Sequence, residues 1–226
     1  MGSRPRICCR TLLIVACISL SVGARAAPDR AATAVELVQA RYDETATLSG
    51  RFVQEVSLGA SGRVIRSEGT LKCHKPGRMR WEYEGPDPRI LIADGKTLWI
   101  HQPEDAQVLR APLEQAFASS TPVSFLFGVA RLGEDFRAKI LPPGRNGSLR
   151  LKLEPKAPDA QGSSGVLVLE VDPTTYDLRA AVVRDPLGNQ TRVALVDIRR
   201  NLTLDESLFI FERPPGTDVQ QAPSGR

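Results

Sequence analysis

The stretch Met79-Arg80-Trp81-Glu82-Tyr83-Glu84 alternates large apolar side chains with charged ones. A period of two residues predicts a β-strand with one face towards an apolar core and the other towards water. The dipeptide Pro76-Gly77 lies just upstream and predicts a turn before this strand. The two glutamates share their face with an arginine, so we interpret them as a solvated surface and not as a catalytic pair.

Further strands are expected on both sides of this one. Upstream, residues 64–73 predict a strand, and Phe52 and Val56 fit one face of an earlier strand. Downstream, Asp94-Gly95 predicts a tight hairpin turn between strands at 90–93 and 97–101. The strand pattern resumes in the second half of the chain, at residues 136–141, 149–153, 166–171, 178–184, 190–198 and 208–211.

Two segments depart from the strand pattern. Residues 33–47 carry apolar side chains at helical spacing, with Thr33 as the expected N-cap. Residues 111–130 contain bulky apolar side chains, and Pro112 and Pro122 lie where two short helices would begin. The chain is therefore predicted to be mainly β. Because a long antiparallel sheet avoids free edges by curling, we expect an incompletely closed barrel whose gap is covered by the helices.

The N-terminus has the pattern of an export signal. Three arginines within the first ten residues precede an uncharged, largely apolar stretch over 11–24. Ala24-Arg25-Ala26 then fits a signal-peptidase site. We expect residues 1–26 to be a signal peptide and residues 27–226 to form a single domain outside the cytoplasm.

A second interpretation of the N-terminus stays open. Ile14-Val15-Ala16-Cys17 resembles a lipobox, the motif that leads to acylation of its cysteine. Its use would make Cys17 a lipid anchor. Against it, the apolar run before Cys17 is shorter than the roughly 7–15 residues usual for a signal peptide.

Without residues 1–26 the chain is close to neutral. That segment holds four of the 30 basic residues and none of the acidic ones, which leaves 26 against 26. We therefore expect no nucleic-acid partner. Cys73 is the one cysteine that remains, so no intrachain disulfide is expected and the thiol is predicted to be buried.

The residues offer little for catalysis. The chain has two histidines, so no histidine metal centre is expected, and no Gly-x-Ser-x-Gly nucleophile motif is present. We predict a non-enzymatic protein with no metal and no cofactor.

A series of short motifs, taken in order, resembles the LolA family of lipoprotein carriers. The motifs extend over nearly all of the chain after residue 26, and their joint order is more specific than any one of them. They are Phe52-x-Gln54, Gly69-Thr70-Leu71, Lys75-Pro76-Gly77-Arg78-Met79-Arg80-Trp81, Asp94-Gly95-Lys96-Thr97-Leu98-Trp99 and Phe209-x-Phe211-x-x-Pro214-x-Gly216.

The resemblance implies a half-open antiparallel β-barrel covered by a helical lid. It also implies a periplasmic carrier, expected to be a monomer, which shields the acyl chains of triacylated lipoproteins. The implied partners are an inner-membrane ABC transporter that releases the lipoproteins and an outer-membrane receptor that accepts them. In the family an arginine directly before the proline of the Pro76 motif tethers the lid. Lys75 occupies that position here and lacks the planar fork of arginine.

Strand parity and helix position give candidate residues for acyl-chain binding. From the strands these are Phe52, Leu71, Met79, Trp81, Tyr83, Ile92, Leu98 and Ile100. From the expected lid they are Leu113, Phe117, Leu126 and Phe127. Other functions remain as alternatives: an anchored receptor like LolB, which requires lipidation at Cys17, a carrier of another amphiphilic lipid, and an exported hydrolase.

Overall fold

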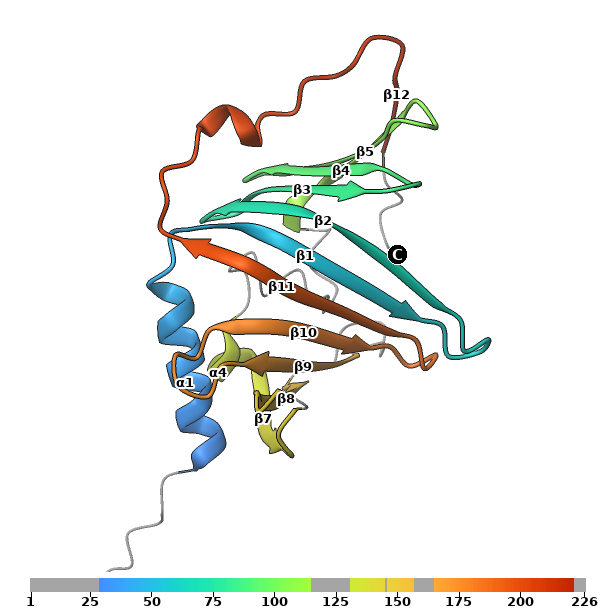
Figure 1. Cartoon of the computed structure of the whole chain (residues 1–226). Helices are drawn as coiled ribbons and strands as arrows, with labels where there is room; N and C mark the ends of the chain where they lie inside the picture. Colours follow the sequence, from blue (N-terminus) through green and yellow to red (C-terminus); the bar gives the residue numbers. More distant parts are fainter. Residues whose placement is uncertain (1–28, 115–130, 145, 157–164, 222–226) are drawn as a thin grey trace, which may run out of the picture.

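The computed structural model describes residues 29–114, 131–144, 146–156 and 165–221 (Figure 1). Its elements are α1 (Arg30–Asp43), β1 (Thr47–Ser57), β2 (Val64–His74), β3 (Arg78–Glu84), β4 (Arg89–Asp94), β5 (Thr97–Gln102), β6 (Gln107–Pro112), α4 (Leu132–Asp135), β7 (Phe136–Leu141), β8 (Leu149–Pro155), β9 (Val166–Val171), β10 (Leu178–Arg184), β11 (Gln190–Arg200), the 3-10 helix η1 (Glu206–Phe209) and β12 (Asp218–Gln221).

The described strands form one twisted sheet of twelve strands in the order β12-β6-β5-β4-β3-β2-β1-β11-β10-β9-β8-β7. β12 pairs with β6 in parallel, and the neighbouring pairs from β6 to β7 are antiparallel. The sheet is not closed, since β12 and β7 form its two ends. The predicted mainly β, incompletely closed architecture with an N-terminal helix is confirmed. Most of the predicted insertion at 111–130 lies outside the described residues. Its first two residues, Ala111 and Pro112, belong to strand β6, so the predicted start of the insertion is wrong.

Both hydrophobic cores lie on the same face of the sheet, here called the inner face. Residues that pair directly across antiparallel strands point to the same side. Val193 of the core around Trp81 pairs with Ala181 of the core beneath α1, which places the two cores on one side. Val35 and Val38 of α1 pack there against β8, β9 and β10. The helix therefore covers one part of the inner face, and the aromatic core around Trp81 occupies the other.

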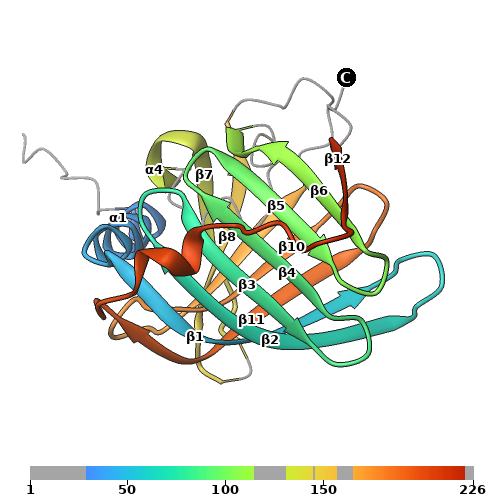
Figure 2. The same ribbon diagram turned by 90° about the horizontal axis from the view of Figure 1, so that it is seen from above.

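The C-terminal segment crosses the opposite, outer face. In Figure 2 it runs from the end of β11 over β3, β4 and β5 to reach β12 beside β6. Arg80 donates a hydrogen bond to the carbonyl oxygen of Leu208, and Phe211 stacks on Trp99 with ring centroids 5.0 Å apart. The motif from Phe209 to Gly216 thus belongs to a strap across the outside of the sheet.

Two predicted elements differ from the structure. α1 begins at Arg30, and its N-cap is Asp29, whose side chain accepts a hydrogen bond from the Ala31 amide. The predicted N-cap, Thr33, lies inside the first turn, so that prediction is wrong. The predicted strand at 208–211 is also wrong, because the Asp205 side chain caps the 3-10 helix η1 there.

Gly69 shows why its motif contains a glycine. A Cβ at this position would lie 1.9 Å from the carbonyl oxygen of Glu82 and 3.0 Å from the Phe52 ring. A side chain here would force the β2 and β3 backbones apart. The glycine therefore lets β2 and β3 approach closely beside the aromatic core.

In the described part of the chain, no helix is long and apolar enough to cross a bilayer.

Candidate functional site

A cavity opens on the inner face, between the C-terminal end of α1 and the sheet. Leu48 and Leu71 line it from β1 and β2, Leu178 from β10, and Leu195 and Ile198 from β11. Cys73 also contributes to the wall, and it is buried as predicted. Because burial raises the pKa of the Cys73 thiol to about 12, this thiol stays neutral at physiological pH.

The cavity is almost entirely apolar, but it is small. Its volume of about 60 Å³ is far below the roughly 300–1,000 Å³ of typical small-molecule sites. An acyl chain therefore does not fit between α1 and the sheet as they stand. Polar contacts around the cavity hold α1 against the sheet. The cavity can enlarge only if these contacts separate.

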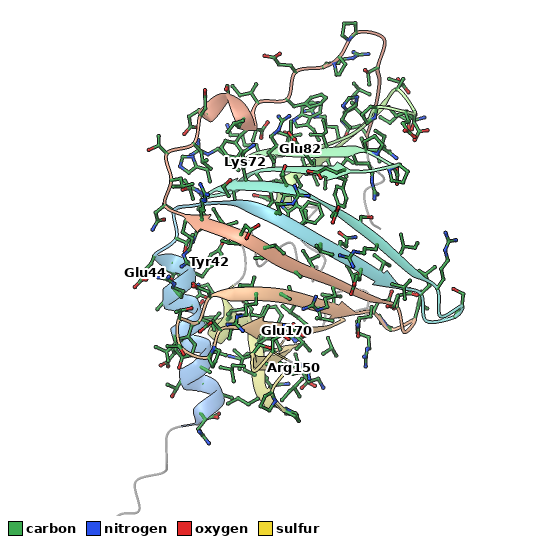
Figure 3. The ribbon with its side chains drawn as sticks, in the orientation of Figure 1. Tyr42, Glu44, Lys72, Glu82, Arg150 and Glu170 are labelled. Carbon is green, nitrogen blue, oxygen red and sulfur yellow. The ribbon has the colours of Figure 1, made fainter. Side chains whose placement is uncertain are left out.

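Lys75 holds one of these contacts. Its ammonium donates a hydrogen bond to the carbonyl oxygen of Tyr42 and lies 3.5 Å from the centroid of the Tyr42 ring. Figure 3 shows Tyr42 at the end of α1, beside the sheet. Burial of Lys75 lowers the pKa of its ammonium. The described contacts of Lys75 thus tie β2 to α1; a contact with residues 115–130, as lid tethering requires, falls outside the described residues.

Substitution Lys75→Met is expected to lower the free energy of unfolding by about 1–2 kcal/mol. Methionine keeps an unbranched apolar stem but removes the hydrogen bond to Tyr42 and the cation–π contact. Lys75→Arg is the matched control, because it keeps the charge and can reach the same carbonyl. Urea denaturation of the three proteins measures the difference, and equal stability of Lys75→Met and wild type would show that this contact does not hold α1.

Asp177 holds the second contact, on the other side of α1. Its carboxylate accepts hydrogen bonds from Arg41 Nε at 2.6 Å and from Arg200, which joins α1 to β11. Thr175 donates a third hydrogen bond, at 2.9 Å. Burial alone would raise the pKa of Asp177, but the hydrogen bonds from Arg41, Thr175 and Arg200 outweigh it and hold the pKa below its ordinary value.

Because the folded-state pKa of Asp177 is depressed, its stabilising contribution is present above the unfolded pKa of about 4 and is lost as the pH falls through the folded value. We expect Asp177→Asn to cost about 2 kcal/mol of unfolding free energy at pH 7. The gap between variant and wild type should narrow towards pH 2.5. Urea denaturation across this pH range measures it; a gap that stays constant would mean that ionisation of Asp177 contributes nothing.

The predicted site residues mostly come together. Phe52, Leu71, Met79, Trp81, Leu98 and Leu113 belong to one buried core on the inner face, and Tyr83 and Ile100 pack against it. Among the described members of this set, Leu71 also lines the cavity. Phe117, Leu126 and Phe127 lie outside the described residues.

The predicted place of Ile92 on the inner face is wrong. Ile92 pairs with Arg80 and Trp99, and its neighbours Leu91 and Ala93 belong with the inner-face core. The run from Ile90 to Ala93 is apolar without interruption, so alternation could not tell which side chains face inwards.

Several cavity residues were absent from the predicted set. Leu195 lies within a predicted strand, and Leu178 begins another, so their strands were expected but their place in the site was not. Tyr42 and Asp177 enter the site through contacts between segments far apart in the chain. No local pattern shows such contacts.

A family model described as outer membrane lipoprotein carrier protein LolA matches residues 43–212. The chain belongs to the LolA family. An outer-membrane lipoprotein carrier protein from Cupriavidus necator is 33% identical over 213 residues, covering 93% of this chain and 98% of the relative. A LolA relative from Pseudomonas aeruginosa is 29% identical over 94% of this chain and 98% of its own.

Among solved structures, a LolA superfamily protein from Nitrosomonas europaea matches with 12% identity and a TM-score of 0.45. The match covers 80% of this chain and 97% of that one.

Membership of the LolA family confirms the resemblance predicted from the motifs. LolA carriers are periplasmic, and the family is non-enzymatic, which removes the exported hydrolase from the alternatives.

Proposed function

We propose that this protein carries lipoproteins through the periplasm by shielding their acyl chains on the inner face of its sheet. An inner-membrane ABC transporter would load it, and an outer-membrane receptor would accept the cargo. The observation that carries this proposal is the apolar cavity beside the Trp81 core, in a chain of the LolA family. Each methylene that leaves water for such a surface gains about 0.8 kcal/mol.

Loading requires the cavity to enlarge. The α1 end is held by Lys75 on one side and Asp177 on the other, both through partly exposed polar groups. Such contacts are individually modest, so acyl chains that bury many methylenes can displace them. We also propose, from the sequence, that residues 115–130 add apolar surface for the acyl chains through Phe117, Leu126 and Phe127.

The proposal is tested by lipoprotein release. Spheroplasts carrying a radiolabelled outer-membrane lipoprotein are incubated with purified residues 27–226. Labelled lipoprotein should appear in the supernatant as a one-to-one complex with the protein. If the lipoprotein stays on the membrane while the protein takes up other lipids, the cargo is a different amphiphile and the proposal fails.

The proposal also includes how the N-terminus is processed. A soluble carrier requires cleavage after Ala26, whereas a LolB-like receptor requires a diacylglyceryl group on Cys17. Mass spectrometry of the protein purified from cells separates the two. A mature chain that starts at Ala27 supports the carrier, and a lipidated Cys17 contradicts it.

A further inference from the structure

The two most exposed large apolar side chains of the described residues lie at one end of the sheet. Leu187, in the turn between β10 and β11, is 82% exposed, and Val64, at the start of β2, is 60% exposed. Ile65 follows Val64 and is 41% exposed. In Figure 1 the β1–β2 and β10–β11 turns lie together at the right, at the end of the sheet away from α1. We call residues 55–66 and 184–192 the hairpin tips.

The hairpin tips are joined to each other. The Gly59 amide donates a hydrogen bond of 3.0 Å to the Asn189 side chain. Asp185 in turn accepts hydrogen bonds from the backbone amide and the side-chain amide of Asn189. A Cβ on Gly59 would lie 2.7 Å from the Gly188 backbone, so the two turns are in close contact. Leu187 and Val64 therefore lie on two turns that are held together.

The charge around these side chains is positive, in a chain that is close to neutral after residue 26. The hairpin tips hold four arginines and two acidic residues, Glu55 and Asp185. Arg63 and Arg184 are exposed, and the Arg66 side chain is 63% exposed. Asp185 accepts hydrogen bonds from Asn189, and Arg192 pairs with Glu170 of β9 at 2.8 Å. Arg66 pairs with Glu55 only at 3.9 Å, so Arg63, Arg66 and Arg184 supply the exposed positive charge.

We propose that the hairpin tips bind the surface of a bilayer that contains anionic phospholipids. Leu187, Val64 and Ile65 would enter the interface, and the arginines would meet the lipid phosphates. Apolar side chains ringed by basic ones are the combination that favours peripheral attachment to such surfaces. The surface lies apart from the cavity, so this attachment is independent of where the acyl chains are held.

Flotation with vesicles tests this inference. Residues 27–226 are mixed with vesicles of equal parts phosphatidylcholine and phosphatidylglycerol, and in parallel with vesicles of phosphatidylcholine alone. Wild type should float with the anionic vesicles and much less with the neutral ones. The double variant Val64→Asp, Leu187→Asp should bind the anionic vesicles about fivefold more weakly.

The matched control is Ile210→Asp, because Ile210 is 59% exposed and lies in the strap instead of the hairpin tips. It should float like wild type, and unchanged melting temperatures should show that all variants fold. Flotation that fails for wild type, or that falls equally in both variants, overturns the inference. The inference is also overturned if the double variant floats like wild type but releases less lipoprotein from spheroplasts. The hairpin tips would then contact a membrane protein and not the lipid surface.

Discussion

Alanine in place of Trp81 is expected to lower the free energy of unfolding by about 3–5 kcal/mol. The indole is 2% exposed at the centre of the inner-face core. It stacks on Phe52 with ring centroids 4.6 Å apart, and it pairs across the strands with Leu71 and Leu91. Its removal would leave a cavity that rigid strands cannot close, which adds to the lost burial.

Urea denaturation followed by circular dichroism measures this loss. Trp81→Phe is the control, because it keeps an aromatic ring against Phe52 and should cost clearly less than the alanine variant. A loss below about 1 kcal/mol for Trp81→Ala would contradict the central place of this side chain in the fold.

Phenylalanine in place of Leu195 is expected to reduce lipoprotein release about thirtyfold. Leu195 lines the cavity, and a larger ring there would occupy the space that the acyl chain needs. Excluding two or three methylenes removes about 2 kcal/mol of binding free energy, which corresponds to that factor.

The neighbouring residue provides the control. Val196 is 40% exposed, so Val196→Phe adds the same ring on the same strand with its side chain in solvent. This variant should release lipoprotein like wild type. If both variants lost activity equally, or neither did, the cavity would not be where the acyl chain binds. Thermal melting confirms that both variants are folded.

Much of the sheet could be predicted because its strands alternate. Met79, Trp81 and Tyr83 were expected on one face, and all three lie in or against the inner-face core. Prediction failed where alternation stops. The run from Ile90 to Ala93 is apolar on both faces, since the strap from β11 covers the outer side of β4 as well. That is why Ile92 was assigned to the wrong face.

Local polar signals explain the other differences. Asp29 and Thr33 are both good N-cap residues, and the buried Ala31, which lies between them, favours the earlier start. The apolar residues from Leu208 to Phe211 look like a strand, but Asp205 caps a 3-10 turn instead. Apolar periodicity alone does not rank such alternatives, because the outcome depends on which polar side chain caps the backbone.

The candidate site was predictable only in part. Lys75 was found through the family motif, and the structure gives it a partner in Tyr42 that no motif names. Arg41 and Asp177 are 136 residues apart, so their contact follows from the pairing of β10 and β11 with the rest of the sheet. The residues predicted from the sequence belong mostly to the apolar core. The polar contacts that border the cavity join distant segments, so only the folded structure shows them.

Site-specific photo-crosslinking shows directly whether the acyl chain lies in the cavity between α1 and the sheet. A photoreactive phenylalanine derivative is placed at Leu178 in the cavity wall or, as a control, at Leu202, which is 41% exposed outside it. Each protein is loaded with a triacylated lipoprotein or with the same lipoprotein lacking its acylated cysteine. We expect a crosslink from position 178 to the acylated cargo alone. Equal crosslinking from both positions, or to cargo without acyl chains, would contradict it.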